Sequence, residues 1–122
     1  MHGRLWARIA AGLWAVGIVV GTLGRASHVG QHLRTTGAGH IVAHVGVFAV
    51  LGALTAYGFG SSRYGRIALV VAVLLGTCAE VYESVAFHGA MEYADVATNV
   101  CGLLLGLGFA YWMERRRASS RT

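Results

Sequence analysis

The 122-residue chain has no proline, no lysine and only two cysteines. Charged residues make up 12% of it, whereas a soluble domain carries about 25%. This shortage excludes the polar surface that a soluble protein of this size needs. No CxxC or Cys/His zinc pattern is present, so Cys78 and Cys101, which both lie in apolar runs, are expected to be small buried residues. A content of 56% hydrophobic residues favours a membrane protein instead.

Four apolar runs fill most of the chain, at residues 5–24, 40–59, 66–87 and 93–113. Each has about the 20 residues that a helix needs to cross a bilayer. None alternates with the period of two that a barrel strand shows. Because lipid offers the backbone no hydrogen-bond partners, each run is expected to be a helix. The sequence therefore predicts an all-α fold, a four-transmembrane-helix bundle in one domain (residues 1–122) with a basic tail at 114–122.

The arginines predict the orientation of this bundle. Eight of the ten lie at one end of the predicted helices, and only Arg25 and Arg34 lie at the other. Cytoplasmic loops carry an excess of arginine, so both termini are expected to be cytoplasmic. The basic tail fits an anchor on the anionic leaflet, so the partner is the lipid bilayer and not a nucleic acid. The eight are Arg4, Arg8, Arg63, Arg66, Arg115, Arg116, Arg117 and Arg121.

The first run also has features of a signal peptide, namely a basic start and small residues near its end. Its apolar core is long and is interrupted by Arg8. We therefore expect a retained helix and a multi-pass protein of a bacterial cytoplasmic membrane. The aromatic residues Trp6, Trp14, Trp112 and Tyr111 are expected to be interfacial or lipid-facing anchors.

Four of the five acidic residues gather between residues 80 and 95, on either side of a short break. The predicted topology places them at the outer end of the bundle, together with several histidines. Glu80 lies about 7–10 Å below that end of its helix, where an unpaired carboxylate is costly. Residues three or four apart share a helix face, as do His40 with His44 and Asp95 with Asn99.

A compact bundle would turn these faces toward one another. Several carboxylates in one niche need compensation by a proton, an imidazolium from His40 or His44, an arginine or a bound cation. The predicted polar pocket consists of Glu80, Asp95, Asn99, His44, Glu83 and His88. Gly102 and Gly106 form a GxxxG pair that would let another helix approach closely. The alternative is that the polar residues only cap the helices and hold them together.

This spacing of polar residues resembles the VanZ-like membrane proteins. The pattern of that family has a histidine near the start of one helix, and His44 stands there. It has a glutamate late in the next helix, which is Glu80 here, and the last helix opens with Asp95-x3-Asn99-x2-Gly102. The resemblance covers roughly residues 40–108. It implies a bacterial cell-envelope protein, since the named member of the family is associated with low-level resistance to the glycopeptide teicoplanin.

Three positions depart from the pattern of the family. Glu83 stands at a glutamine position, and the arginine of the following turn would fall at Gly89, beside His88. The lysine or aspartate that often precedes the histidine of the first matching helix is missing. The cluster therefore loses a cation and gains a carboxylate, which alters any ligand-binding role carried over from the family.

The first functional hypothesis is a non-enzymatic envelope protein whose outward-facing pocket binds a lipid-linked precursor, a glycopeptide or another amphiphile. The second is an intramembrane metal-dependent hydrolase or transferase, because carboxylates with imidazoles suit a divalent cation. The third is a small proton- or cation-coupled transporter, which would require a homo-oligomer to enclose a pathway. No HExxH or comparable motif occurs, so no metal ligand or catalytic residue is assigned and no cofactor is expected.

Overall fold

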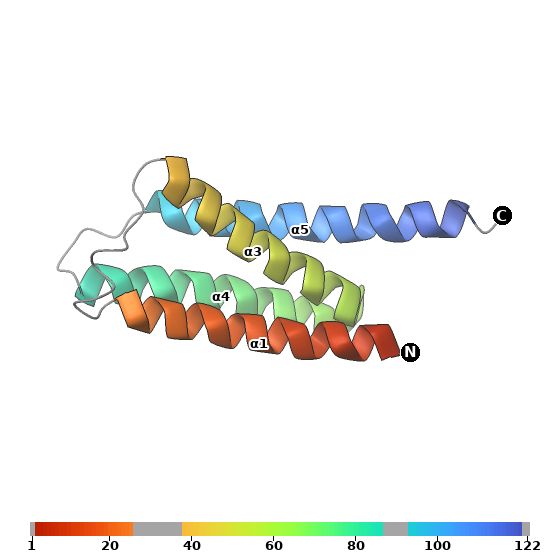
Figure 1. The fold of residues 1–122 in the computed structure, drawn as a ribbon, viewed down its shortest axis with the longest axis horizontal. Helices are drawn as coiled ribbons and strands as arrows, with labels where there is room; N and C mark the ends of the chain where they lie inside the picture. Colours follow the sequence, from red (N-terminus) through yellow and green to blue (C-terminus); the bar gives the residue numbers. More distant parts are fainter. Residues whose placement is uncertain (1, 26–37, 87–92, 121–122) are drawn as a thin grey trace.

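A computed structural model describes residues 2–25, 38–86 and 93–120, which form four helices and no strand within these ranges (Figure 1). Each helix is long and apolar enough to span a membrane, so the chain has the build of a multi-pass membrane protein. The all-α prediction with four spans is confirmed to this extent. The helices are α1 (His2–Arg25), α3 (Ala38–Phe59), α4 (Arg63–Ala86) and α5 (Tyr93–Ser119).

The last helix is longer than the sequence predicts. It ends at Ser119, so most of the expected basic tail is helical. Arginine is a good helix former, and its long side chain can lie along the helix while its charge stays at the membrane surface. The guanidinium of Arg116 lies over the ring of Trp112, and that of Arg117 lies over Tyr57 of α3. The first of these cation–π contacts lies within α5, and the second joins the end of α5 to α3.

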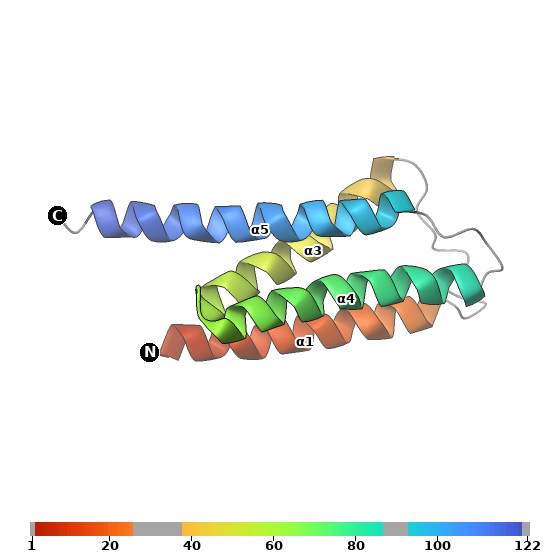
Figure 2. The same ribbon diagram turned by 180° about the vertical axis from the view of Figure 1, so that it is seen from behind.

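Helix α3 runs diagonally across one face of the bundle. In Figures 1 and 2 it passes from the start of α5 to the side where α1 and α4 lie together. The most extensive contacts of α3 are with α5, followed by those with α1. Both chain termini lie at the same end of the bundle as the turn between α3 and α4 (Figure 1).

The contact between α3 and α5 depends on glycine. A Cβ atom at Gly106 would collide with the carbonyl oxygen of Ala49, and one at Gly102 would lie 2.5 Å from the carbonyl oxygen of Val45. On the facing helix, a Cβ at Gly52 would meet the carbonyl of Leu103. The two backbones therefore touch, as small residues permit in membrane helices.

The buried core is small and lies around α3. It consists of Phe48 and Leu51 from this helix with Leu103, Ala11 and Ala72 from the other three. Many other large apolar side chains point outward, which suits lipid and not water. Cys78 and Cys101 are among the exposed side chains, so the prediction that they are buried is wrong. Their apolar surroundings in the sequence reflect the apolar outer surface of the helices and not a protein core.

A tight turn joins α3 to α4. Gly60 has a φ of 60°, a conformation that closes a helix and that residues with a Cβ rarely adopt. The hydroxyl of Ser62 accepts a hydrogen bond from the backbone N–H of Gly65 at 3.2 Å and so caps the start of α4. This short connection holds α3 and α4 antiparallel, which places the start of α3 and the end of α4 at the same end of the bundle (Figure 1).

Candidate functional site

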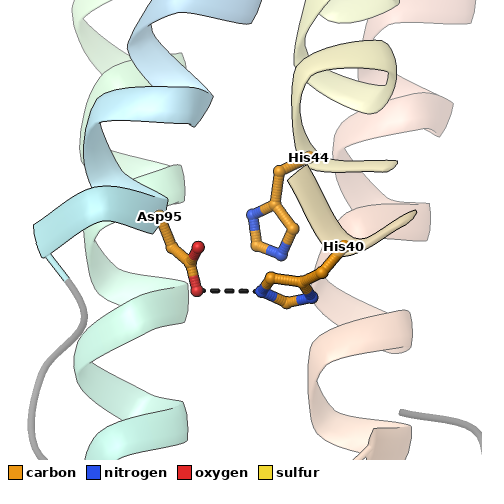
Figure 3. A group of neighbouring side chains, drawn as sticks. All are labelled: His40, His44 and Asp95. Carbon is orange, nitrogen blue, oxygen red and sulfur yellow. Dashed lines mark hydrogen bonds and ion pairs between the residues drawn. The ribbon is translucent and has the colours of Figure 1, made fainter. Parts of the chain in front are cut away.

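Five polar side chains from three helices form a cluster at the end of the bundle opposite the chain termini. His40 and His44 come from α3, Glu80 from α4, and Asp95 and Asn99 from α5. Figure 3 shows the two histidines one helical turn apart and facing the carboxylate of Asp95. We call these five residues the polar cluster.

Asn99 links the three helices within the polar cluster. Only 2% of its surface is exposed. Its Nδ2 donates a hydrogen bond to Oε1 of Glu80 at 3.1 Å, and its Oδ1 lies 2.8 Å from Nδ1 of His44. The carboxylate of Glu80 is also 3.5 Å from the same histidine nitrogen. Both ends of the amide are therefore satisfied, which is the condition for burying it.

These contacts determine which ring nitrogen of His44 carries the proton. The amide oxygen of Asn99 only accepts hydrogen bonds, so Nδ1 of His44 carries the proton and donates it. In the neutral ring, Nε2 then carries a lone pair. This nitrogen is buried and has no hydrogen-bond partner among the described residues, and the whole residue is 8% exposed. A buried polar atom without a partner is uncommon in folded proteins.

His40 and Asp95 form the outer part of the polar cluster. Nε2 of His40 lies 2.9 Å from Oδ2 of Asp95, and the two side chains are 21% and 10% exposed. The ring of His40 also lies against that of His44, with centroids 4.3 Å apart. One nitrogen from each histidine and one oxygen of Asp95 lie within 4.8 Å of one another. These three residues form the one group within the described ranges that is arranged to hold a metal ion.

A cavity of about 530 Å³ lies beside the polar cluster, between α1, α3 and α4. It is partly open, and we call it the groove. Small and apolar side chains form most of its wall, whereas His44, Glu80 and Glu83 supply its charged and imidazole groups. Such a composition is typical of a ligand pocket, which is mainly apolar with a few polar groups that orient the ligand. The apolar residues include Leu13, Trp14, Gly17, Ile18 and Val47.

Five of the six residues predicted from the sequence are therefore distributed over two adjoining places. Glu80, Asp95, Asn99 and His44 belong to the polar cluster, and Glu83 lines the groove. His88 lies outside the described residues.

Two residues of the site were not assigned to it from the sequence. His40 contacts Asp95, and its four-residue spacing from His44 was the available signal. Trp14, expected as an interfacial or lipid-facing anchor, also lines the groove and donates its indole N–H to the carbonyl of Val47 at 2.9 Å. Nothing in the sequence pairs α1 with α3.

Comparisons with protein-family models, with curated proteins and with solved structures give no match for this chain. The chemistry of the polar cluster and the shape of the groove therefore carry the functional proposal. The combination to be explained is a hydrogen-bonded set of carboxylates and imidazoles, placed at one end of four apolar helices and open to an apolar groove.

Proposed function

We propose that this chain is a non-enzymatic, VanZ-like protein of the bacterial cytoplasmic membrane that binds an amphiphile at its outer face. Both termini are cytoplasmic in this proposal, because eight of the ten arginines lie at or near their end of the chain's helices. The apolar part of the ligand occupies the groove, and its polar head meets His44, Glu80 and Glu83.

The groove is the observation that carries the proposal. Its volume of about 530 Å³ lies within the range of about 300–1,000 Å³ that small-molecule pockets occupy. Leu13 and Ile18 of α1 and Val47 of α3 all line it, so an acyl or polyprenyl chain would meet apolar side chains from two helices. The polar residues that line it lie toward the predicted outer end of α3 and α4. A ligand with an apolar chain and a polar head fits this layout.

The acidic side chains indicate which heads would bind. Carboxylates accept hydrogen bonds, so Glu80 and Glu83 favour hydroxyl or ammonium groups over a bare phosphate. Sugars and amines are such groups, and both lipid-linked envelope precursors and glycopeptides carry sugars. The resemblance of residues 40–108 to VanZ-like proteins supports the same ligand class and adds teicoplanin as a test compound.

Filling the groove should abolish the activity. Expression of the chain in a teicoplanin-sensitive bacterium is expected to raise the minimal inhibitory concentration several-fold, and Gly17→Trp is expected to remove this gain. Gly17 lines the groove and has open space where a Cβ would be, so the indole can enter the groove without displacing backbone. Lipid retained by the purified proteins, identified by mass spectrometry, is expected to fall in the same variant.

Gly12→Trp is the matched control. Gly12 lies on the same helix and also has open space around it, but it does not line the groove. This variant should retain resistance and bound lipid. Unchanged susceptibility on expression of the wild type would contradict the function, and equal behaviour of the two variants would contradict the role of the groove.

The orientation can be checked separately. Alkaline phosphatase fused after Ala86 is expected to be active, because this end of α4 faces the outside in the proposed topology. The same enzyme fused after Ser120 should be inactive, whereas a green fluorescent protein at that position should fluoresce. The reverse pattern would place the polar cluster on the cytoplasmic side and exclude an envelope ligand.

A further inference from the structure

We propose that His40, His44 and Asp95 bind a divalent transition-metal ion, with zinc as the preferred occupant. Figure 3 shows the three side chains converging from α3 and α5 on one small volume. His44 belongs both to this site and to the groove, but the amphiphile proposal does not require a metal ion, because neither His40 nor Asp95 lines the groove.

The arrangement of donor atoms is the first observation. Two histidines four residues apart on one helix present their rings on the same face, as in the helical zinc motif HExxH. Asp95 supplies a carboxylate from the facing helix, and one donor atom from each residue lies within 4.8 Å of the others. Two imidazoles with one carboxylate are a donor set found in catalytic zinc sites with an open fourth position.

The unpartnered nitrogen of His44 is the second, independent observation. Its Nδ1 proton is donated to Asn99, so the lone pair is on Nε2. That atom is buried without a hydrogen-bond partner among the described residues and points toward His40 and Asp95 (Figure 3). A bound cation would satisfy it, whereas a proton there would have no described acceptor. Leaving such a group unpaired costs about 1–3 kcal/mol.

Asn99 and Glu80 act as positioning residues for His44. Histidine ligands of metals usually donate their other ring nitrogen to a carboxylate, a carbonyl or water, which fixes both the tautomer and the ring orientation. Here the amide oxygen of Asn99 accepts that proton at 2.8 Å, and Glu80 holds the amide in place through its Nδ2 at 3.1 Å. This explains why the most buried polar side chain of the cluster contacts His44 and not solvent.

Binding requires modest rearrangement. Zinc ligands in tetrahedral geometry, with bonds of about 2.0–2.1 Å, lie about 3.4 Å apart. Donor atoms at the upper limit of 4.8 Å would therefore approach by about 1.4 Å, and the 2.9 Å pair of His40 and Asp95 would open by about 0.5 Å. His40 must present the lone pair of Nε2, so the proton now shared with Asp95 passes to Nδ1 of the same ring by exchange with solvent, and the ring stays neutral. The ion would also bring two positive charges to a niche that holds the two carboxylates of Glu80 and Asp95.

The donor types decide which ions fit. Imidazole nitrogens suit Zn²⁺ and related transition metals, whereas Mg²⁺ and Ca²⁺ prefer oxygen ligands. With three protein ligands, a fourth position remains for water, which zinc makes more acidic. A loaded site would therefore also be compatible with the alternative of a metal-dependent hydrolase or transferase.

The test uses the full chain, purified in detergent and stripped with a chelator. Titration with Zn²⁺ alone, followed by calorimetry, is expected to show one ion per chain. Co²⁺ as a second probe should give the visible absorption bands of a tetrahedral site. His40→Gln and Asp95→Asn should each lower the affinity for Zn²⁺ by more than about 100-fold. Substituting a residue that only holds a metal ligand in place typically lowers the affinity by roughly 10- to 100-fold. Asn99→Ala should fall within that smaller range.

His2→Gln is the matched control, because His2 is exposed at the start of α1 and far along the chain from the proposed ligands. It should bind zinc like the wild type. Asp95→Asn keeps a hydrogen-bond acceptor for His40, so it tests the site without relying on a variant that fails to fold. Absence of saturable binding in the wild type would overturn the proposal, as would wild-type affinity in both ligand variants.

Discussion

A leucine in place of Gly106 is expected to lower the free energy of unfolding by about 3 kcal/mol, the upper end of the usual range for overpacking. The backbones of α3 and α5 touch here, because even a single Cβ at Gly106 would overlap the carbonyl of Ala49 and crowd the backbone nitrogen of Ala53. Backbone atoms cannot rotate away as a flexible side chain would. The helices would have to separate, and the polar cluster that depends on their contact would separate with them.

Gly108→Leu is the matched control for this prediction. Gly108 lies two residues along the same helix, and a Cβ added there would meet nothing within 4 Å, so leucine at this position should be neutral or slightly stabilising. Unfolding of purified protein in mixed micelles, followed by circular dichroism, gives both free energies. If the two leucine variants unfolded alike, α3 and α5 would not be in backbone contact.

The second large effect is expected for Asn99→Ala, which should lower the free energy of unfolding by about 2–4 kcal/mol. This change removes two hydrogen bonds, one of them to a carboxylate, and leaves a small cavity. Glu80 and the Nδ1 proton of His44 would both lose their partner in a place with little access to water. Their direct contact at 3.5 Å offers partial compensation, which limits the loss.

Thr98→Ala is the control that separates the loss of the interhelical hydrogen bonds from the loss of a polar side chain in general. Thr98 is the neighbouring residue, and its hydroxyl donates a hydrogen bond to the carbonyl of Asp95 in its own helix at 2.9 Å. Its loss should cost under about 1 kcal/mol, as for a typical local hydrogen bond. Both variants should be measured in the presence of a chelator, because a bound metal would add stability of its own. Equal losses for the two would show that Asn99 does not link the three helices.

Gly106→Leu and Asn99→Ala test different parts of the contact between α5 and its neighbours. Gly106 lies deeper along α5 than Asn99, so the first change acts on helix contact and the second on the polar groups that this contact brings together. A folded Asn99→Ala protein with weakened zinc affinity would connect the network to the proposed metal site. Weakened zinc affinity without loss of fold is a result that a purely structural role would not produce.

Much of the fold could be predicted from the sequence. The four helices follow from apolar runs of sufficient length, because a backbone in lipid has to satisfy its own hydrogen bonds. The ends of the helices were less predictable. α5 continues through Arg115, Arg116 and Arg117 because its arginines are good helix formers with aromatic partners at two positions. Hydropathy alone marks where a run stops being apolar, and not where a helix stops.

Part of the candidate site could also be predicted from the sequence, and part of it could not. The helical period showed which residues share a face, so His40 with His44 and Asp95 with Asn99 could be grouped from spacing alone. The period does not show how far each helix is rotated or which neighbour it meets. The pairing of His40 with Asp95 and the place of Trp14 in the groove therefore required the packed structure.

Residue order thus determined the spans, the grouping of arginines at one end and the polar stripes on single helices. Tertiary structure alone decided that α3 runs diagonally from α5 to the α1–α4 pair, because that choice depends on how small residues on two helices meet. It also decided that one nitrogen of His44 is buried without a described partner while the other is held by Asn99. A hydrogen bond between two helices depends on the distance between them. The spacing of residues along one helix does not give that distance.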